Sequence, residues 1–180
     1  MARTRWLGVG ALFVTLLAWG GPLRADGAAD NDTFQDFIFN GCMLAMTKGI
    51  AIDLYAQGNH LMPANPNLAA SFLQGRPGTV YMKATAQTVL IIAQGAGGYC
   101  TAATRVAPDL AGLQQAIDAK LQGPGVGLVF VKEDHRVLGG GPSTTREYDG
   151  KIGNTPLGAK MSIAQNSLPQ AVFTVYRKSQ

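Results

Sequence analysis

The chain has 180 residues, of which 47% are hydrophobic and 14% are charged, a composition typical of one folded domain rather than a disordered chain. Its formal net charge is +4, but Arg3, Arg5 and Arg24 lie in a leader-like segment, so 12 basic and 11 acidic residues remain beyond it and the net charge there is +1. These basic residues are scattered singly, which argues against nucleic-acid binding, because that function needs a clustered basic stripe.

Residues 1–25 have the layout of a secretory signal peptide. Arg3 and Arg5 form a positive start, and an uncharged apolar run over residues 6–21 follows. That run is shorter than the roughly 20 residues that a membrane-spanning helix needs. Residues 22–25 then supply a break at Pro22 and a small residue at Ala25, and a small residue there suits cleavage by a signal peptidase.

Cleavage is expected after Ala25 or after Ala29, and both positions stay open. The mature protein is then expected to be periplasmic or secreted, in a Gram-negative bacterium, with no stable membrane anchor. Beyond the leader, the sequence predicts a flexible start over residues 26–32 and a single domain over residues 33–180.

The chain has two cysteines, Cys42 and Cys100. In an oxidising compartment two cysteines most often pair, so we predict a disulfide. The alternative is a reactive thiol with His60 or His135 as its base. That alternative needs a reduced cysteine, and no local motif supports it. The two cysteines also lack the CxxC spacing of a redox pair or a zinc site.

The N-terminal part of the domain is expected to be helical. Thr33 and Asp36 imitate a capping box, after which an amphipathic helix should begin. Apolar residues then recur at helical spacing and should face the core. They are Phe34, Phe37, Ile38, Cys42 and Leu44. Two further helical stretches are expected over residues 50–57 and 68–74.

Three strands are expected next, over residues 79–84, 88–94 and 99–105. The middle strand is apolar without alternation, which is typical of a central strand covered on both faces. Glycines in 95–98 should form a hairpin connection. This segment lacks the Lys-Ser/Thr of a phosphate loop, and it joins two strands where such a loop joins a strand to a helix.

A further helix is predicted after the third strand, with Pro108 near its start, Asp109 in its first turn and Gly123 past its end. Its apolar face consists of Leu110, Leu113, Ile117 and Leu121.

The last third of the chain is rich in strand patterns. Strands are expected over residues 126–136, 144–148, 158–164 and 171–176. The last two should pair, and Asp149-Gly150 should form a turn. The predicted fold is therefore α+β, with one antiparallel sheet, N-terminal helices and one connecting helix packed on one side of it, in the order ααα-βββ-α-ββββ.

Residues 132–136 form the densest charged cluster, and they raise two catalytic alternatives. His135 could work with Glu133 or Asp134 as the acid–base pair of a hydrolase, or the same residues could form a metal corner. Neighbouring residues on a strand point to opposite faces, so Asp134 is poorly placed to orient His135, whereas Glu133 shares its face. No nucleophile motif accompanies any serine. We interpret the cluster as the solvated end of a hairpin.

A partner-binding surface is predicted on the polar strands after residue 123, because tyrosine and arginine are favoured anchors at interfaces. Its residues are His135, Arg136, Arg146, Tyr148 and Lys151.

Three short motifs carry a resemblance to a protein family. They are F-x-x-F-I-x-x-x-C from Phe34, R-P-G-T-V-Y from Arg76 and G-G-Y-C-T around Cys100. Over residues 34–104 the chain resembles small exported two-cysteine proteins of Gram-negative bacteria with no assigned function. The resemblance implies a periplasmic, disulfide-bonded domain, and it brings no catalytic residues.

The first functional hypothesis is therefore an exported, non-catalytic domain that binds a protein or an envelope component. Inhibitors and immunity proteins against secreted enzymes belong to this class. No cofactor, metal or nucleic acid is expected. The alternatives are a small-ligand sensor, with a pocket lined by Leu90, Ile92 and Ile117, and the hydrolase that uses His135.

Overall fold

The computed structural model describes residues 24–107, 109–138 and 141–178. The helices are α1 (Arg24–Asp36), the π-helical segment η1 (Phe37–Met43), α2 (Leu44–Lys48), α3 (Ile52–Gly58), α4 (Pro66–Leu73) and α5 (Leu110–Gln122). The strands are β1 (Met62–Pro63), β2 (Gly78–Ala84), β3 (Val89–Gly95), β4 (Tyr99–Thr104), β5 (Leu128–Leu138), β6 (Gly141–Ile152), β7 (Thr155–Ala164) and β8 (Ala171–Arg177).

All these strands belong to one antiparallel sheet in the order β1-β2-β3-β4-β8-β7-β6-β5. The α+β class with a single antiparallel sheet is confirmed. Two meanders, β2–β3–β4 and β6–β7–β8, meet at the centre, where β4 pairs with β8. Thr101 lies opposite Thr174 there, and their hydroxyl oxygens are 2.9 Å apart.

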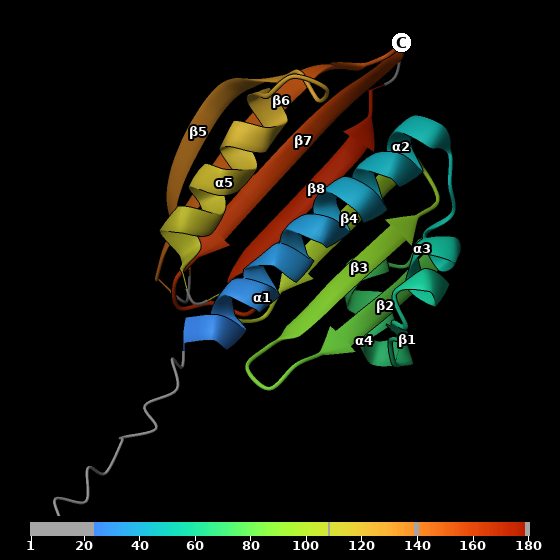
Figure 1. Ribbon diagram of the computed structural model, residues 1–180, viewed down its shortest axis with the longest axis vertical. Coiled ribbons are helices and arrows are strands. Elements are labelled where there is room, and N and C mark those ends of the chain that lie inside the picture. Colours follow the sequence, from blue (N-terminus) through green and yellow to red (C-terminus); the bar gives the residue numbers. More distant parts are fainter. Residues whose placement is uncertain (1–23, 108, 139–140, 179–180) are drawn as a thin grey trace, which may run out of the picture.

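One face of the sheet carries most of the helices. Figure 1 shows α1 and α2 running across that face beside α5. The chain is helical without a break from α1 through α2, and Gly49 ends it with a φ of 68°. A glycine is favoured at this position because a side chain would strain a left-handed backbone.

The predicted apolar stripe is confirmed at Phe34, Phe37 and Ile38, which are almost fully buried. Leu44, which the sequence assigned to the same stripe, is 38% exposed. Since the helix continues through this point, Leu44 lies on its outward side.

The predicted flexible start over residues 26–32 is helical instead, because α1 begins at Arg24. Thr33 therefore lies inside a helix, and its hydroxyl donates to the carbonyl of Ala29. Asp30 is buried and accepts a hydrogen bond from Thr85, the first residue after β2. This part of the helix thus packs on the domain. The predicted leader over residues 1–25 lies almost entirely outside the described residues.

The predicted disulfide is present. Cys42 of η1 and Cys100 of β4 are bonded, with their Cα atoms 5.2 Å apart, and both side chains are fully buried. The bond excludes the reactive-thiol alternative, and it ties the N-terminal helix to the centre of the sheet. A disulfide is typical of proteins that work outside the cytoplasm.

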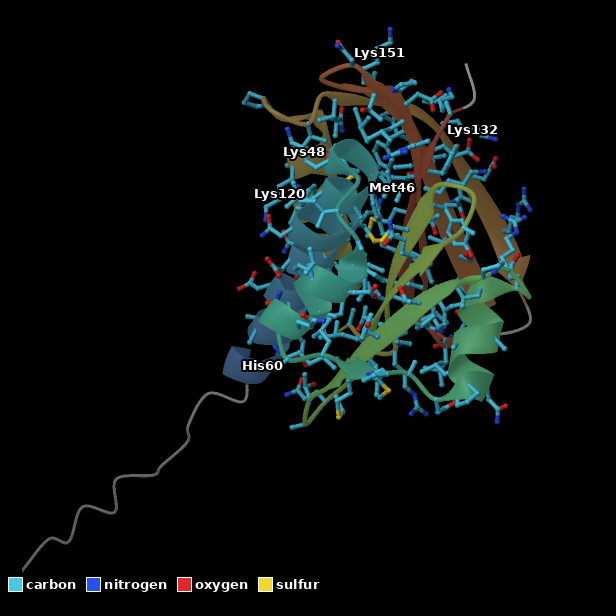
Figure 2. All side chains as sticks on the ribbon, turned by 90° about the vertical axis from the view of Figure 1, so that its right-hand side faces the viewer. Met46, Lys48, His60, Lys120, Lys132 and Lys151 are labelled. Atoms are coloured by element: carbon cyan, nitrogen blue, oxygen red, sulfur yellow. A yellow bond between two sulfur atoms is a disulfide. The ribbon has the colours of Figure 1, made fainter. Side chains whose placement is uncertain are left out.

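The prediction that all helices pack on one side of the sheet is wrong for α4. Figure 2 shows α4 across the sheet from α1, α2 and α3. Leu73 of α4 is buried with Val80, Ile91 and Ala93 on this second face. The middle strand β3 is therefore covered on both faces, as its continuous apolar run predicts.

Two local predictions in the second half also need correction. Asp109 is the N-cap of α5, and its side chain accepts from the amide of Gly112; Pro108 lies outside the described residues. Asp149 and Gly150 do not form a turn but lie within β6, opposite Val129 and Leu128. A Cβ on Gly150 would stand 2.8 Å from the carbonyl oxygen of Gly127, so this glycine serves a close approach of two strands.

Candidate functional site

The second half of the sheet ends in a long free edge. β5 has 11 residues and pairs with β6 on one side, and among the described residues no strand pairs with its other side. We call this free side the β5 edge. Such an edge presents unpaired backbone N–H and C=O groups, which can accept another strand.

Apolar side chains are exposed toward both ends of β5. The exposed fractions are 65% for Val129, 40% for Phe130, 52% for Val131 and 86% for Val137. Single exposed apolar residues are ordinary, but here three follow one another at the start of a strand with a free side, and Val137 adds a fourth near its other end. A partner strand that covered them would remove apolar surface from water.

A bulge divides β5 between Phe130 and Lys132, where the pairing with β6 shifts by one residue. Val131 is the extra residue there and is left without a partner on β6. Bulges bend a strand and re-aim its side chains, and they are frequent at sheet edges. The bulge thus separates the apolar start of β5 from its charged centre.

The charged centre of β5 follows the alternation that the sequence predicts. Lys132 and Asp134 lie on the face opposite α5, where Lys132 Nζ is 3.5 Å from a carboxylate oxygen of Asp134 and also from one of Glu147. Lys160 of β7 is 2.9 Å from the same Glu147. Its hydrogen bond lowers the pKa of the Glu147 carboxyl. Exposed pairs like these contribute little to stability, at most about 1 kcal/mol each.

On the face that packs against α5, Arg146 joins two carboxylates. Its guanidinium forms ion pairs with Asp118 of α5 and with Glu133 of β5. Tyr148 donates its hydroxyl hydrogen to the same Asp118, and the amide of Gln114 lies against the guanidinium. This network fixes β5 and β6 to α5.

Burial sets the electrostatics of this network. Tyr148 is 1% exposed, and its burial and its hydrogen bond to Asp118 raise the pKa of its hydroxyl above the ordinary value. Burial acts to lower the pKa of Arg146. The hydrogen bond with Glu133 and the negative charge of Asp118 act in the opposite direction and outweigh burial, so the pKa of Arg146 is raised overall. Tyr148 therefore stays neutral and Arg146 stays charged at ordinary pH, as structural groups do.

The structure divides the predicted interaction surface. His135 and Arg136 are exposed on β5, and Lys151 is exposed near the end of β6. Tyr148 is buried and cannot serve as a surface anchor, and Arg146 is held by its two carboxylates. The predicted surface is therefore wrong at Tyr148, because α5 covers that side of β6.

Sequence reasoning missed Asp118, which organises the network. It follows Ile117 of the apolar face of α5 and stands four residues after Gln114. A carboxylate beside an apolar stripe is a weak signal of a buried ion pair. The sequence does not show which strand the helix covers, so the arginine partner could not be named.

His135 bridges two neighbours on the same face of the hairpin. Its Nε2 is 2.9 Å from Glu133 and its Nδ1 is 3.2 Å from the hydroxyl of Thr144. Asp134 points to the other face, as predicted. The His135 side chain is 70% exposed, so water has free access to it.

The pocket predicted for a small-ligand sensor is filled. Leu90, Ile92 and Ile117 are all fully buried in the main core. The space predicted for a ligand between β3 and α5 is therefore occupied by side chains.

Among the described residues, no group of three or more histidine, cysteine, aspartate or glutamate side chains could share a metal ion. None of the helices within 24–107, 109–138 and 141–178 has the length and apolar character to cross a membrane.

Neither a protein-family model, nor a curated protein, nor a solved structure matches this chain.

Proposed function

We propose that this chain is an exported binding domain, and that it captures an extended segment of a partner protein as an additional strand on the β5 edge. The observation that carries the proposal is the length of this free strand together with its exposed valines and Phe130. Strand addition takes its affinity from backbone hydrogen bonds and its specificity from alternate side chains.

The charged centre of β5 supports selective binding. An apolar edge with no charges would pair indiscriminately and aggregate, and charged residues on edge strands oppose this. Lys132, Asp134 and Arg136 alternate in sign along one face. A partner segment must match this pattern with opposite charges while covering the apolar ends.

The compartment follows from the predicted leader and is supported by the disulfide. Both are typical of a periplasmic or secreted protein. The partner is then a protein or an envelope component of the same compartment, and an inhibitor or immunity-type role against a secreted enzyme fits this mode of binding.

Site-specific photocrosslinking in cells that express the full chain tests the proposal. A photoreactive residue replaces Val129 on the β5 edge in one strain and Leu54 on α3 in another. The two side chains are equally exposed, at 65%, so Leu54 is a matched control. We expect a discrete crosslinked partner from position 129 and none from position 54.

The isolated complex then tests the mode of binding by amide hydrogen exchange. Strand addition should slow the exchange of alternate β5 amides by about tenfold or more, because they gain hydrogen bonds. Equal adducts at both positions, or unchanged exchange in β5, would contradict the proposal. A crosslink between two copies of this chain would show that the β5 edge pairs with a second copy, which would contradict the proposal of a different partner protein.

A further inference from the structure

The second face of the sheet carries a groove that the β5 edge does not explain. Its floor is formed by β2 and β3, one wall by α4, and the other wall by the connection between β7 and β8. The groove has a volume of about 440 Å³. This lies within the roughly 300–1,000 Å³ that small-molecule sites occupy.

The groove exists because α4 is too short to cover this face. α4 has eight residues, and Leu73, its last residue, is the only residue of this helix that is buried. Phe72 and Met82 remain half-exposed beside it, and Leu168 on the opposite wall is 62% exposed. Apolar side chains thus line the floor and both walls without closing over them.

One end of the groove is polar. A second hollow of about 460 Å³ adjoins the first, and the two share Val89, Arg105 and Leu168. Thr85, Gln87 and Thr88 line this second hollow. The two hollows meet at these shared residues, so the apolar groove beside α4 continues into a more polar hollow beyond Arg105.

Arg105 stands at the junction and is presented from a fixed backbone. Its amide donates to the carbonyl of Val89 at 3.0 Å, and its carbonyl accepts from the amide of Gln170 at 3.3 Å. Among the described residues that line the two hollows, Arg105 alone is charged, and no ion pair of the described chain includes it. Arg105 is exposed, so its positive charge is solvated by water and accessible to a ligand.

We propose that this groove binds a single-chain amphiphile with one carboxylate, of the fatty-acid class, with its alkyl chain between Phe72 and Leu168 and its carboxylate on Arg105. One arginine balances one negative charge, and the planar guanidinium matches a carboxylate with two parallel hydrogen bonds. The apolar floor and walls cover part of the alkyl chain and remove that part from water. The site does not include the β5 edge. It lies on the face of the sheet that carries α4, whereas the pocket predicted from the sequence lies on the opposite face and is filled.

Calorimetric titration of the purified protein with dodecanoate, below the concentration at which it forms micelles, tests the proposal. We expect saturable binding of one molecule per chain. Arg105→Gln should weaken the binding of dodecanoate about tenfold, since a charge-assisted hydrogen bond is lost. The same substitution should leave the binding of 1-dodecanol unchanged, because this alcohol lacks the charge. Arg136→Gln on β5 is the matched control and should change neither affinity.

A second measurement needs no substitution in the groove. Methyl groups of methionine are labelled for nuclear magnetic resonance, and dodecanoate is added to the unaltered protein. The signal of Met82 in the groove should shift, whereas that of Met46, which is 2% exposed in the other core, should stay in place.

Three results would overturn the proposal. The first is the absence of saturable dodecanoate binding, and the second is binding that Arg105→Gln does not weaken. The third is tighter binding of dodecyl phosphate than of dodecanoate, which would assign the groove to a phosphate headgroup.

Discussion

Tyr148 shows how one residue changes its role through its neighbours. Its place among charged residues of a polar strand predicts a surface anchor, yet α5 covers it and Asp118 accepts its hydroxyl hydrogen. Tyr55 is placed similarly, because its hydroxyl donates to Asp36 of α1 and burial raises its pKa. At the residue scale, three tyrosine–aspartate pairs join helices to their surroundings, the third being Tyr81 of β2 with Asp53 of α3, and spacing along the chain indicates none of them.

The raised pKa values of Tyr55 and Tyr148 predict an alkaline limit of stability. An ordinary tyrosine loses its proton with a pKa of about 10. The folded chain holds these two protons more tightly, so their contribution to stability is complete below pH about 10 and is lost as the pH rises through the higher folded pKa.

An ultraviolet titration of tyrosinate, followed together with circular dichroism, checks this expectation. The protein has five tyrosines, and Tyr55 and Tyr148 should ionise only as the fold is lost. In denaturant all five should ionise together near pH 10. Tyr148→Phe should remove one late-ionising group. Ionisation of all five in a still folded protein would contradict the assignment.

At the scale of elements, the long N-terminal helix depends on its close approach to β3. Gly41 makes this approach, since a Cβ there would stand 2.5 Å from Cδ1 of Ile92 and 3.3 Å from the ring of Tyr55. The sequence predicts the helix and its apolar stripe from spacing alone. The role of Gly41 depends on the sheet beneath it, which local spacing does not describe.

Gly41→Ala should therefore lower the free energy of unfolding by about 1–2 kcal/mol, because overpacking against fully buried Ile92 exceeds the helix propensity gained. Gly58→Ala in α3 is the control, since the added Cβ has no atom within 4 Å apart from its chain neighbours and the backbone of its own helix. Urea denaturation compares the two variants. An equal loss of stability at both positions would show that the contact with Ile92 does not cause the effect of Gly41→Ala.

At the scale of the whole molecule, two meanders share one sheet through the pairing of β4 with β8, and the disulfide sits beside this seam. Cys100 lies opposite Val175 of β8, while Cys42 comes from the helix above. The first and last parts of the chain are thus joined at one place. Such long-range pairing is slow to form, because distant segments must meet before any contact stabilises them.

Cys42→Ser and Cys100→Ser should each lower the free energy of unfolding by about 2–5 kcal/mol. Each substitution removes the same disulfide, which closes a loop between residues 58 positions apart in the sequence. The two losses should agree, and the double variant should cost no more than about the larger single loss. Chemical denaturation with and without reductant measures all of them. Clearly unequal single losses would contradict the assignment of one shared bond.

The sequence by itself determined the features that are local or that follow from composition. Apolar runs and alternation predicted the strands β2 to β8 and the helix α5 but not the short strand β1, and the two cysteines predicted their bond. Only the tertiary structure placed α4 on the second face, Asp118 over Arg146 and β5 at the free edge. The reason is physical: spacing along the chain says which side of an element is apolar, whereas the element that covers it is chosen by contacts between distant segments. The β5 edge, on which the proposed function depends, and the groove beside α4, on which the further inference depends, are both features that only the tertiary structure shows.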